Sequence, residues 1–367
     1  MQKAMVDKSV FINEKTMNKN ICIVVGARPN FVKVAPLIRA IDRTEGAIYE
    51  LIYTGKEDDP TLEDSLFEDL QMPRPGIFFN VDSTKLNEIT SRVMSEFDNY
   101  LENHPTDVVI VVDDLASTMA AAIVTKKRGV KLAHLVAGTR SFDINMPKEI
   151  NRLVIDALSD YLFTAGVKSN SVASREQGET SQTYMVGNIL MDSLRYNRDR
   201  LKKPQLDIEE GKYLVLTLNR KILLTDKEKL AELLKTLVEV AKEVPVVAPL
   251  REQARKVIEE MNLGIKVVQP LPYLEFGWLS AHAKGIVTDS GNVAEEATFN
   301  MIPCITLNSY TEHKETVTVG SNVLVDGDAE KLRESLQMLM DGKWKTCELP
   351  DRWDGRTAER IVQILVG

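Results

Sequence analysis

The stretch that decides the fold is ICIVVGARPNFVKVAPLIRAI, residues 21–41, which joins an unbroken apolar run to a helical pattern. An apolar run without alternation predicts a strand buried on both faces, as in parallel sheets that helices cover on both sides. Pro29 presets the start of the following helix. Arg28 stands at the junction, so a rigid turn would hold its guanidinium at the carboxyl end of the strand.

The same alternation of buried strand and amphipathic helix continues along the chain. Further strands are expected at 50–54, 108–112, 131–135, 161–164 and 183–186, with helices at 61–69, 88–103, 116–127, 147–158 and 168–176 between them. A second series has strands at 213–218, 244–250, 265–271, 285–290, 302–307 and 323–327, again separated by helices. This pattern predicts the α/β class, with two doubly wound parallel sheets.

A polar segment without apolar periodicity separates the two series and is interpreted as a linker. We therefore expect a loose extension over 1–20, a first domain over 21–200, a linker over 201–211 and a nucleotide-binding domain over 212–355. The C-terminal segment 356–367 is expected to pack back on the first domain. The first twenty residues lack the apolar core of a signal peptide.

Composition narrows the class of partner. The formal net charge is −8 for 367 residues, which argues against a nucleic-acid-binding surface. No segment is long and apolar enough to cross a bilayer, so no membrane partner is expected. Cys22 and Cys304 lie in apolar runs, a pattern typical of reduced, buried thiols and of a cytoplasmic protein.

Open α/β sheets bind ligands where loops leave the carboxyl ends of strands. Ser290, Gly291 and Asn292 open such a helix, whose free amides suit a diphosphate, while Glu296 could accept hydrogen bonds from ribose hydroxyls. The alternative is that Ser290 only caps the helix and that the acidic residues complement its dipole.

Arg28 and Lys33, one turn apart, predict an anion site at the first strand. The alternative for Arg28 is an ion pair with a surface carboxylate. His313 lies in a loop that could contact diphosphate or sugar, or it is simply exposed. The sequence has neither metal-ligand spacing nor a G-x-G-x-x-G after a strand, so we expect no metal and no cofactor.

Several motifs recur in one order: GARPNFVKVAPL, PKEINRLVIDALSD, VGNILMDSL, PYLEFGWL, VTDSGNVAEEA and DGRTAERIV. From about residue 20 to its end the chain thereby resembles the non-hydrolysing UDP-N-acetylglucosamine 2-epimerase family. The resemblance implies two Rossmann-like domains in the GT-B arrangement and a homodimer. It also implies a reaction on a UDP-sugar: UDP is eliminated across C1 and C2 of the sugar and added back with C2 inverted.

The residues expected to bind UDP are Arg28, Lys33, Arg251, Phe276, Ser290, Gly291, Asn292, Glu296 and His313. The resemblance implies a place in the site for Arg28, Ser290 and Glu296. It also puts Phe276 against the uracil and includes the T-E-x-x-E loop at 311–315. Those expected at the reacting sugar are Asp114, Lys148, Glu149, Arg152 and Asn219. The implied product is a precursor of cell-surface polysaccharide.

The chain departs from the family pattern at positions where the reaction implied by the resemblance requires proton transfer. Val136 replaces a glutamate in H-x-E-A-G-L-R, Lys148 replaces the first glutamate of P-E-E-x-N-R, and Asn219 replaces the histidine of T-x-H-R. Asp114 persists, but Asp113 precedes it in place of glycine, and Arg251 stands where a histidine is expected. Valine cannot titrate, and asparagine is no acid or base near neutral pH.

Three functions therefore compete. The chain could epimerise a UDP-2-acetamido sugar with Asp114, Glu149 or Lys148 in altered roles. It could instead catalyse another nucleotide-sugar reaction, such as glycosyl transfer or UDP elimination, in which cations stabilise the leaving diphosphate. It could also be a non-catalytic UDP-sugar-binding paralogue. The epimerase-type reaction is our prediction.

Overall fold

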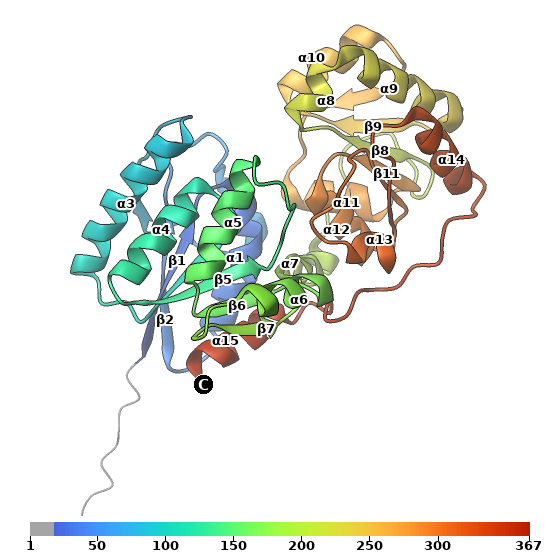
Figure 1. Ribbon diagram of the computed structural model, residues 1–367. Helices are drawn as coiled ribbons and strands as arrows, with labels where there is room; N and C mark the ends of the chain where they lie inside the picture. Colours follow the sequence, from blue (N-terminus) through green and yellow to red (C-terminus); the bar gives the residue numbers. More distant parts are fainter. Residues whose placement is uncertain (1–17) are drawn as a thin grey trace, which may run out of the picture.

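The computed structural model describes residues 18–367, apart from the side chains of residues 221 and 222. Two halves lie side by side, each a parallel sheet between helices (Figure 1). The strands of the first sheet run β3-β2-β1-β4-β5-β6-β7. Their bounds are β1 Lys19–Val25, β2 Ala47–Tyr53, β3 Ile77–Phe78, β4 Val108–Val112, β5 Lys131–Ala137, β6 Tyr161–Thr164 and β7 Gln182–Met185.

The helices of the first half are α1 Arg28–Ile41, α2 Asp64–Leu70, α3 Leu86–Asn103, α4 Ala116–Lys127, α5 Pro147–Leu158, α6 Val167–Glu176 and α7 Ile189–Asn197. Alternate residues of β1 pack into different cores. Ile23 and Val25 pack in the core that contains α1, whereas Cys22 and Val24 pack in the core that contains α3 and α4. The apolar run of the sequence is therefore buried on both faces, as predicted.

The second sheet runs β10-β9-β8-β11-β12-β13. Its strands are β8 Leu214–Thr217, β9 Val246–Pro249, β10 Lys266–Val268, β11 Gly285–Thr288, β12 Cys304–Thr306 and β13 Asn322–Leu324. Its helices are α8 Lys221–Thr225, α9 Lys227–Ala241, α10 Glu252–Met261, α11 Tyr273–Ala281, α12 Gly291–Phe299, α13 Glu315–Thr318 and α14 Ala329–Met340. The prediction of an α/β protein with two doubly wound sheets is confirmed.

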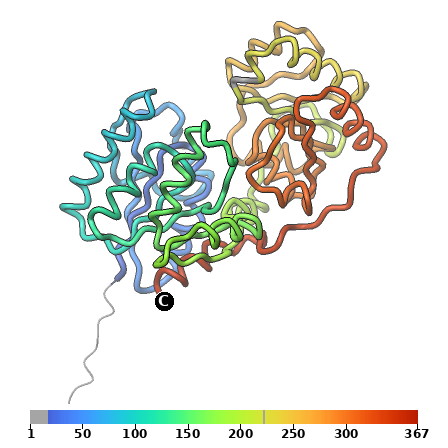
Figure 2. Tube along the Cα trace, in the orientation of Figure 1, coloured from blue at the N-terminus to red at the C-terminus, as the bar shows by residue number. Residues whose placement is uncertain are grey.

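The last helix, α15 Thr357–Val366, lies against α1 and α7 of the first half. Figure 2 shows the chain running back from the second half to reach this place. Asp192 in α7 accepts hydrogen bonds from the backbone N–H groups of Thr357 and Ala358, at 3.0 and 2.7 Å. This carboxyl group therefore caps the first turn of α15.

Local differences from the predicted elements are small. β1 begins at Lys19 rather than at 21, because Lys19 and Asn20 already pair with β2. The short elements β3, α8 and α13 carry too few residues to give a periodic signal. The extension predicted over 1–20 falls, for residues 1–17, outside the described residues. Among residues 18–367, no helix is long and apolar enough to cross a membrane.

Candidate functional site between the two sheets

Each sheet has a switch point, where the strand order reverses, and these are the places where open α/β sheets bind ligands. In the first sheet it lies between β1 and β4, and in the second between β8 and β11. The loops after these four strands carry Arg28, Asp114, Asn219 and Ser290. The fold thus places four of the sequence-predicted site residues at the two switch points.

Arg28 is the first residue of α1 and is partly buried. Burial lowers the pKa of its guanidinium; the carboxylate of Glu63 acts against this, and the charge of Arg251 lowers the pKa further. Arg251 precedes α10 in the second half. Within residues 18–367 neither arginine has a carboxylate within ion-pair distance. Two cations from opposite halves thus act on each other, and in the described chain neither forms an ion pair, contrary to the surface-pair alternative.

Ser290 precedes α12 without making a side-chain hydrogen bond to the helix, so the capping alternative is not realised. A Cβ at Gly291 would meet nothing within 4 Å, which leaves space at the first turn beside Asn292. The preceding residue, Asp289, accepts hydrogen bonds from the backbone N–H groups of Asn219 and Arg220. This places the exposed Asn219 side chain at the same sheet edge as the start of α12.

Asp114 lies on the opposing wall, in a network of charges. Lys148 Nζ is 3.0 Å and Arg152 Nη2 is 2.6 Å from its carboxylate oxygens. Burial raises the pKa of Asp114, but the two cations lower it more, so the pKa falls below its usual value. Asp114 is therefore ionised at neutral pH.

Arg152 also binds two further carboxylates. Its Nη1 lies 3.2 Å from Glu149 Oε2, and its Nη2 forms an ion pair with Glu312 of the second half. Glu149 accepts hydrogen bonds from the Ser141 amide and hydroxyl and from the Phe142 amide. Burial opposes these bonds, yet together with Arg152 they keep the pKa of Glu149 below its usual value. Glu312 lies in the loop 311–315 that the family resemblance includes in the site, but its pairing with Arg152, 160 residues away, was not predicted from the sequence.

Lys33 is buried and is not free for a ligand. Its Nζ lies 2.6 Å from Asp113 Oδ1, and this carboxylate, with Glu295, raises the lysine pKa against the opposing effect of burial. Asp113 lies next to Asp114 and has φ of 59°. Val136, at the family's glutamate position, has φ of 76°, a conformation that β-branched residues rarely adopt.

On the nucleotide side, Glu296, Phe276 and Tyr273 line one small cavity with Asn300. Burial, and secondarily the charge of Glu295, raises the pKa of Glu296 to about 8. Its carboxyl group is therefore largely protonated at neutral pH and can donate a hydrogen bond. A protonated carboxyl group still accepts hydrogen bonds as well, so acceptance from ribose hydroxyls by Glu296 stays a prediction.

His313 is buried, not exposed, so that alternative is excluded. Its Nε2 lies 3.7 Å from Glu295 Oε1, and its ring meets the edge of Trp353. Asn188 of the first half donates a hydrogen bond of 2.6 Å to Glu295 Oε2. His313 thus belongs to a buried cluster between the halves.

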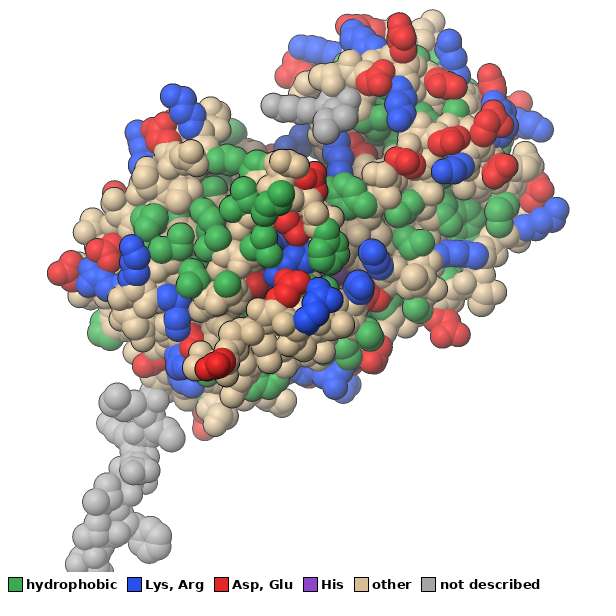
Figure 3. Space-filling model, viewed as in Figure 1, with side chains coloured by type: hydrophobic (Ala, Val, Ile, Leu, Met, Phe, Trp, Pro, Cys, Tyr) green, Lys and Arg blue, Asp and Glu red, His purple; other side chains and the backbone are tan. Residues whose placement is uncertain are grey.

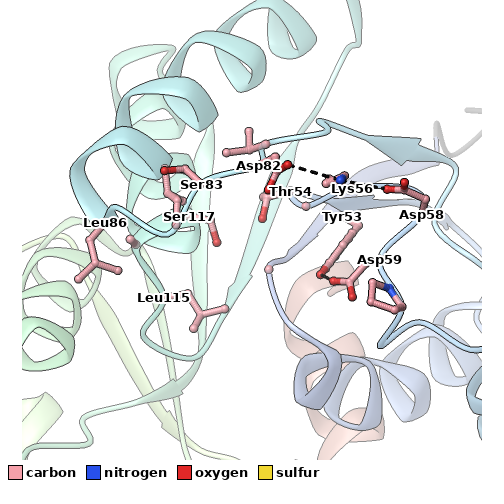
Figure 4. Close-up of a pocket in the computed structure, with 16 residues that line it drawn as sticks. Tyr53, Thr54, Lys56, Asp58, Asp59, Asp82, Ser83, Leu86, Leu115 and Ser117 are labelled. Carbon is pink, nitrogen blue, oxygen red and sulfur yellow. Dashed lines mark hydrogen bonds and ion pairs between the residues drawn. The ribbon is translucent and has the colours of Figure 1, made fainter.

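A pocket of about 420 Å³ opens beside the first switch point (Figure 4). It is lined by Gly26, Tyr53, Thr54, Gly55, Lys56, Asp58, Asp59, Pro60, Val81, Asp82, Ser83, Leu86, Ile89, Leu115, Ala116 and Ser117. Sequence reasoning missed the loop 54–60, although it follows a predicted strand of the same sheet. The rule that ligands bind after strands would have found it.

The sequence profile of the UDP-N-acetylglucosamine 2-epimerase family matches residues 39–366. The chain belongs to this family. Epimerase motifs seen in the sequence thus reflect true membership, and the predicted resemblance is confirmed.

Two relatives of this family member cover nearly its whole length. The UDP-N-acetylglucosamine 2-epimerase of Methanocaldococcus jannaschii is 33% identical over 364 residues, which are 94% of this chain and 98% of the relative. The UDP-2,3-diacetamido-2,3-dideoxy-D-glucuronate 2-epimerase of Pseudomonas aeruginosa is 32% identical over 94% of this chain and 99% of its own.

A solved structure agrees with the fold. The Methanocaldococcus jannaschii enzyme, crystallised with UDP-GlcNAc and UDP, has a TM-score of 0.83 at 32% identity and covers 94% of this chain and 99% of its own. The GT-B arrangement predicted for this epimerase-family chain is therefore confirmed.

Proposed function

We propose that this protein is an isomerase that binds a UDP-2-acetamido sugar between its halves and inverts C2 by eliminating and re-adding UDP. Its product would serve as a precursor of cell-surface polysaccharide. The observation that carries the proposal is the pair of cations, Arg28 and Arg251, which come from opposite halves and have no carboxylate partner in the described chain. A diphosphate between them would supply the missing negative charge.

The nucleotide would lie on the second half. The first-turn amides at Gly291 and Asn292, with the Ser290 hydroxyl, suit the phosphates, because a helix N-terminus favours anions. The protonated carboxyl group of Glu296 would hydrogen-bond a ribose hydroxyl, with Phe276 beside the base. We propose that Lys33 and His313 do not contact the nucleotide directly. Their buried contacts, with Asp113 and Glu295, would instead hold the surrounding loops in place.

In the reaction, a base takes the C2 proton, the C–H electron pair forms the C1=C2 bond, and UDP leaves with the electrons of its C1–O bond. Re-addition reverses these steps with the proton delivered to the other face. Asp114 is our candidate base, since it is ionised and lies on the wall that faces the nucleotide side. Lys148 and Arg152 hold it, Glu149 orients Arg152, and Asn219 would bind the sugar.

A second candidate follows from the same network. A carboxylate bound by two cations is a weak base, and low basicity reduces general-base catalysis. This observation favours a reaction that needs no C2 base, such as glycosyl transfer, or binding without turnover.

The deciding experiment has two stages. Calorimetric titration tests whether UDP and UDP-GlcNAc bind between the halves, and we expect both ligands to bind. Incubation of UDP-GlcNAc with the enzyme in D2O then tests the chemistry: an epimerase labels C2 with deuterium. UDP binding without label would support the second candidate, and absence of any binding would overturn both.

We propose a homodimer on the basis of an apolar surface on the first half. Hydrophobic side chains gather on the face seen in Figure 3. On α5 and the loop before it, exposed large apolar side chains include Phe142, Ile144, Ile150 and Leu153. Patches of this kind mark protein interfaces. Light scattering should give a mass of two chains, and Ile150→Glu should reduce it to one.

We also propose a cytoplasmic location. Cys22, Cys304 and Cys347 are all unpaired thiols, as is usual in a reducing compartment. Fractionation of cells followed by immunodetection would test the location.

A further inference from the structure

Asp113 is an unusual residue for the place that it occupies. It follows β4 directly and has φ of 59°, in the left-handed region that favours glycine. Aspartate tolerates this conformation better than most residues, but still at a cost. An aspartate at such a position, where the family motif has glycine, calls for a specific role.

Both carboxylate oxygens of Asp113 are engaged. Oδ1 accepts a hydrogen bond of 2.6 Å from Lys33 Nζ, and Oδ2 accepts one of 2.7 Å from Asn30 Nδ2. Its backbone oxygen lies 3.0 Å from His134 Nε2. The residue therefore ties the end of β4 to α1 and to β5.

Asn30 connects Asp113 to the loop that carries Arg28. Its Oδ1 accepts hydrogen bonds from the backbone N–H groups of Gly26 and Ala27, at 3.0 and 3.1 Å. Because the amide oxygen is used in this way, the amide nitrogen must point to Asp113. The carboxylate thus selects the one orientation of Asn30 that closes the loop.

We infer that Asp113 is a positioning residue: its carboxylate fixes Asn30 and Lys33 and thereby holds the Gly26–Arg28 loop in the arrangement that binds diphosphate. The inference rests on the proposed function for its ligand. The charges that face Asp113 are those of Lys33 and, beyond it, Glu295 and Glu312, which also act on Lys33.

A positioning role for Asp113 and simple electrostatics predict opposite changes in the affinity for UDP when its charge is removed. Removing the negative charge of Asp113 leaves Lys33 unpaired and adds one positive charge to the cleft. By charge alone, UDP should then bind more tightly. If Asp113 positions the loop, UDP should bind more weakly in spite of the added charge.

Two variants separate the roles. Asp113→Asn removes the charge and can keep only one of the two bonds, since its own NH2 group cannot bond to that of Asn30. Asp113→Gly removes both bonds but suits φ of 59°, so it guards against misfolding. Asp326→Gly is the matched control, because Asp326 has φ of 55° and an exposed side chain.

Two measurements decide the inference. Hydrogen exchange, read by mass spectrometry on a fragment covering Gly26 and Ala27, should be at least tenfold faster in both Asp113 variants than in wild type and Asp326→Gly. Calorimetry should show UDP bound at least tenfold more weakly by both. Unchanged exchange, or UDP binding that is equal or tighter, would overturn the inference.

The exchange measurement does not depend on the ligand. If wild type binds no UDP, the proposed function fails, and exchange at Gly26 and Ala27 still decides whether Asp113 holds the loop. If wild type binds UDP and the variants bind it equally well, only the role of Asp113 is lost.

Discussion

Lys148 Nζ lies 3.0 Å from Asp114 Oδ1, so a cation holds the aspartate at a point where the family motif has a carboxylate. Together with Arg152, this lysine keeps the Asp114 pKa low. Two cations beside Asp114 lower its pKa, whereas a neighbouring carboxylate would raise it.

Lys148→Met should lower the free energy of unfolding at pH 7 by about 0.5–1 kcal/mol, a small effect because the lysine side chain is 56% exposed. The low Asp114 pKa contributes stability that is present above the ordinary value of 3.8 and is lost as the pH falls below it. The difference from wild type should therefore shrink in acid. Urea titrations at pH 7 and in acid would measure it, with the exposed Lys235→Met as control.

Arg152→Met should lower the free energy of unfolding much more, by about 3–5 kcal/mol. The reason is that it removes the cation that forms ion pairs with three carboxylates. Arg152→Lys should recover only part of this, since an ammonium group cannot reproduce the guanidinium fork. Denaturant unfolding is the measurement. Arg92→Met, which breaks an exposed pair with Glu88 in the same helix, should cost less than about 1 kcal/mol. Equal losses at the two arginines would refute the buried network.

Glu296→Gln should flatten the pH dependence of stability. The Glu296 pKa is raised from 4.5 to about 8, so the protonated group contributes stability that is full below 4.5 and is lost as the pH rises through about 8. Wild type should lose on the order of 1–3 kcal/mol more than the variant between pH 5 and pH 9. Urea unfolding across this range measures the effect. The exposed Glu334→Gln should keep the wild-type slope.

Arg28→Met and Arg251→Met should each weaken UDP binding about tenfold, which corresponds to about 1.4 kcal/mol. Neither change should destabilise the ligand-free protein through loss of an ion pair, because no carboxylate within residues 18–367 forms one with these arginines. Calorimetry and thermal melts together test both statements. A stability loss that accompanies full UDP affinity would show that the arginines are structural.

The positions of most strands could be predicted because apolar runs such as VVIVV at 108–112 lie in fully buried strands. The likeness to the epimerase family was also readable, since its motifs are local in sequence. The short strand β3 and the loop 54–60 were missed: a two-residue strand has no period, and a pocket-lining loop has no fixed composition.

The amino-acid sequence by itself determined the α/β class, the two sheets and the family, because burial patterns and motifs are local properties of the chain. It also marked Arg28, Asp114 and Ser290 as residues that follow strands. Only the tertiary structure decided which charged residues of the site meet. Lys33 pairs with Asp113, Arg152 pairs with Glu312, and Arg28 lies near Arg251. These pairs join segments about 80 to more than 200 residues apart, and such contacts depend on how the two sheets pack and face each other.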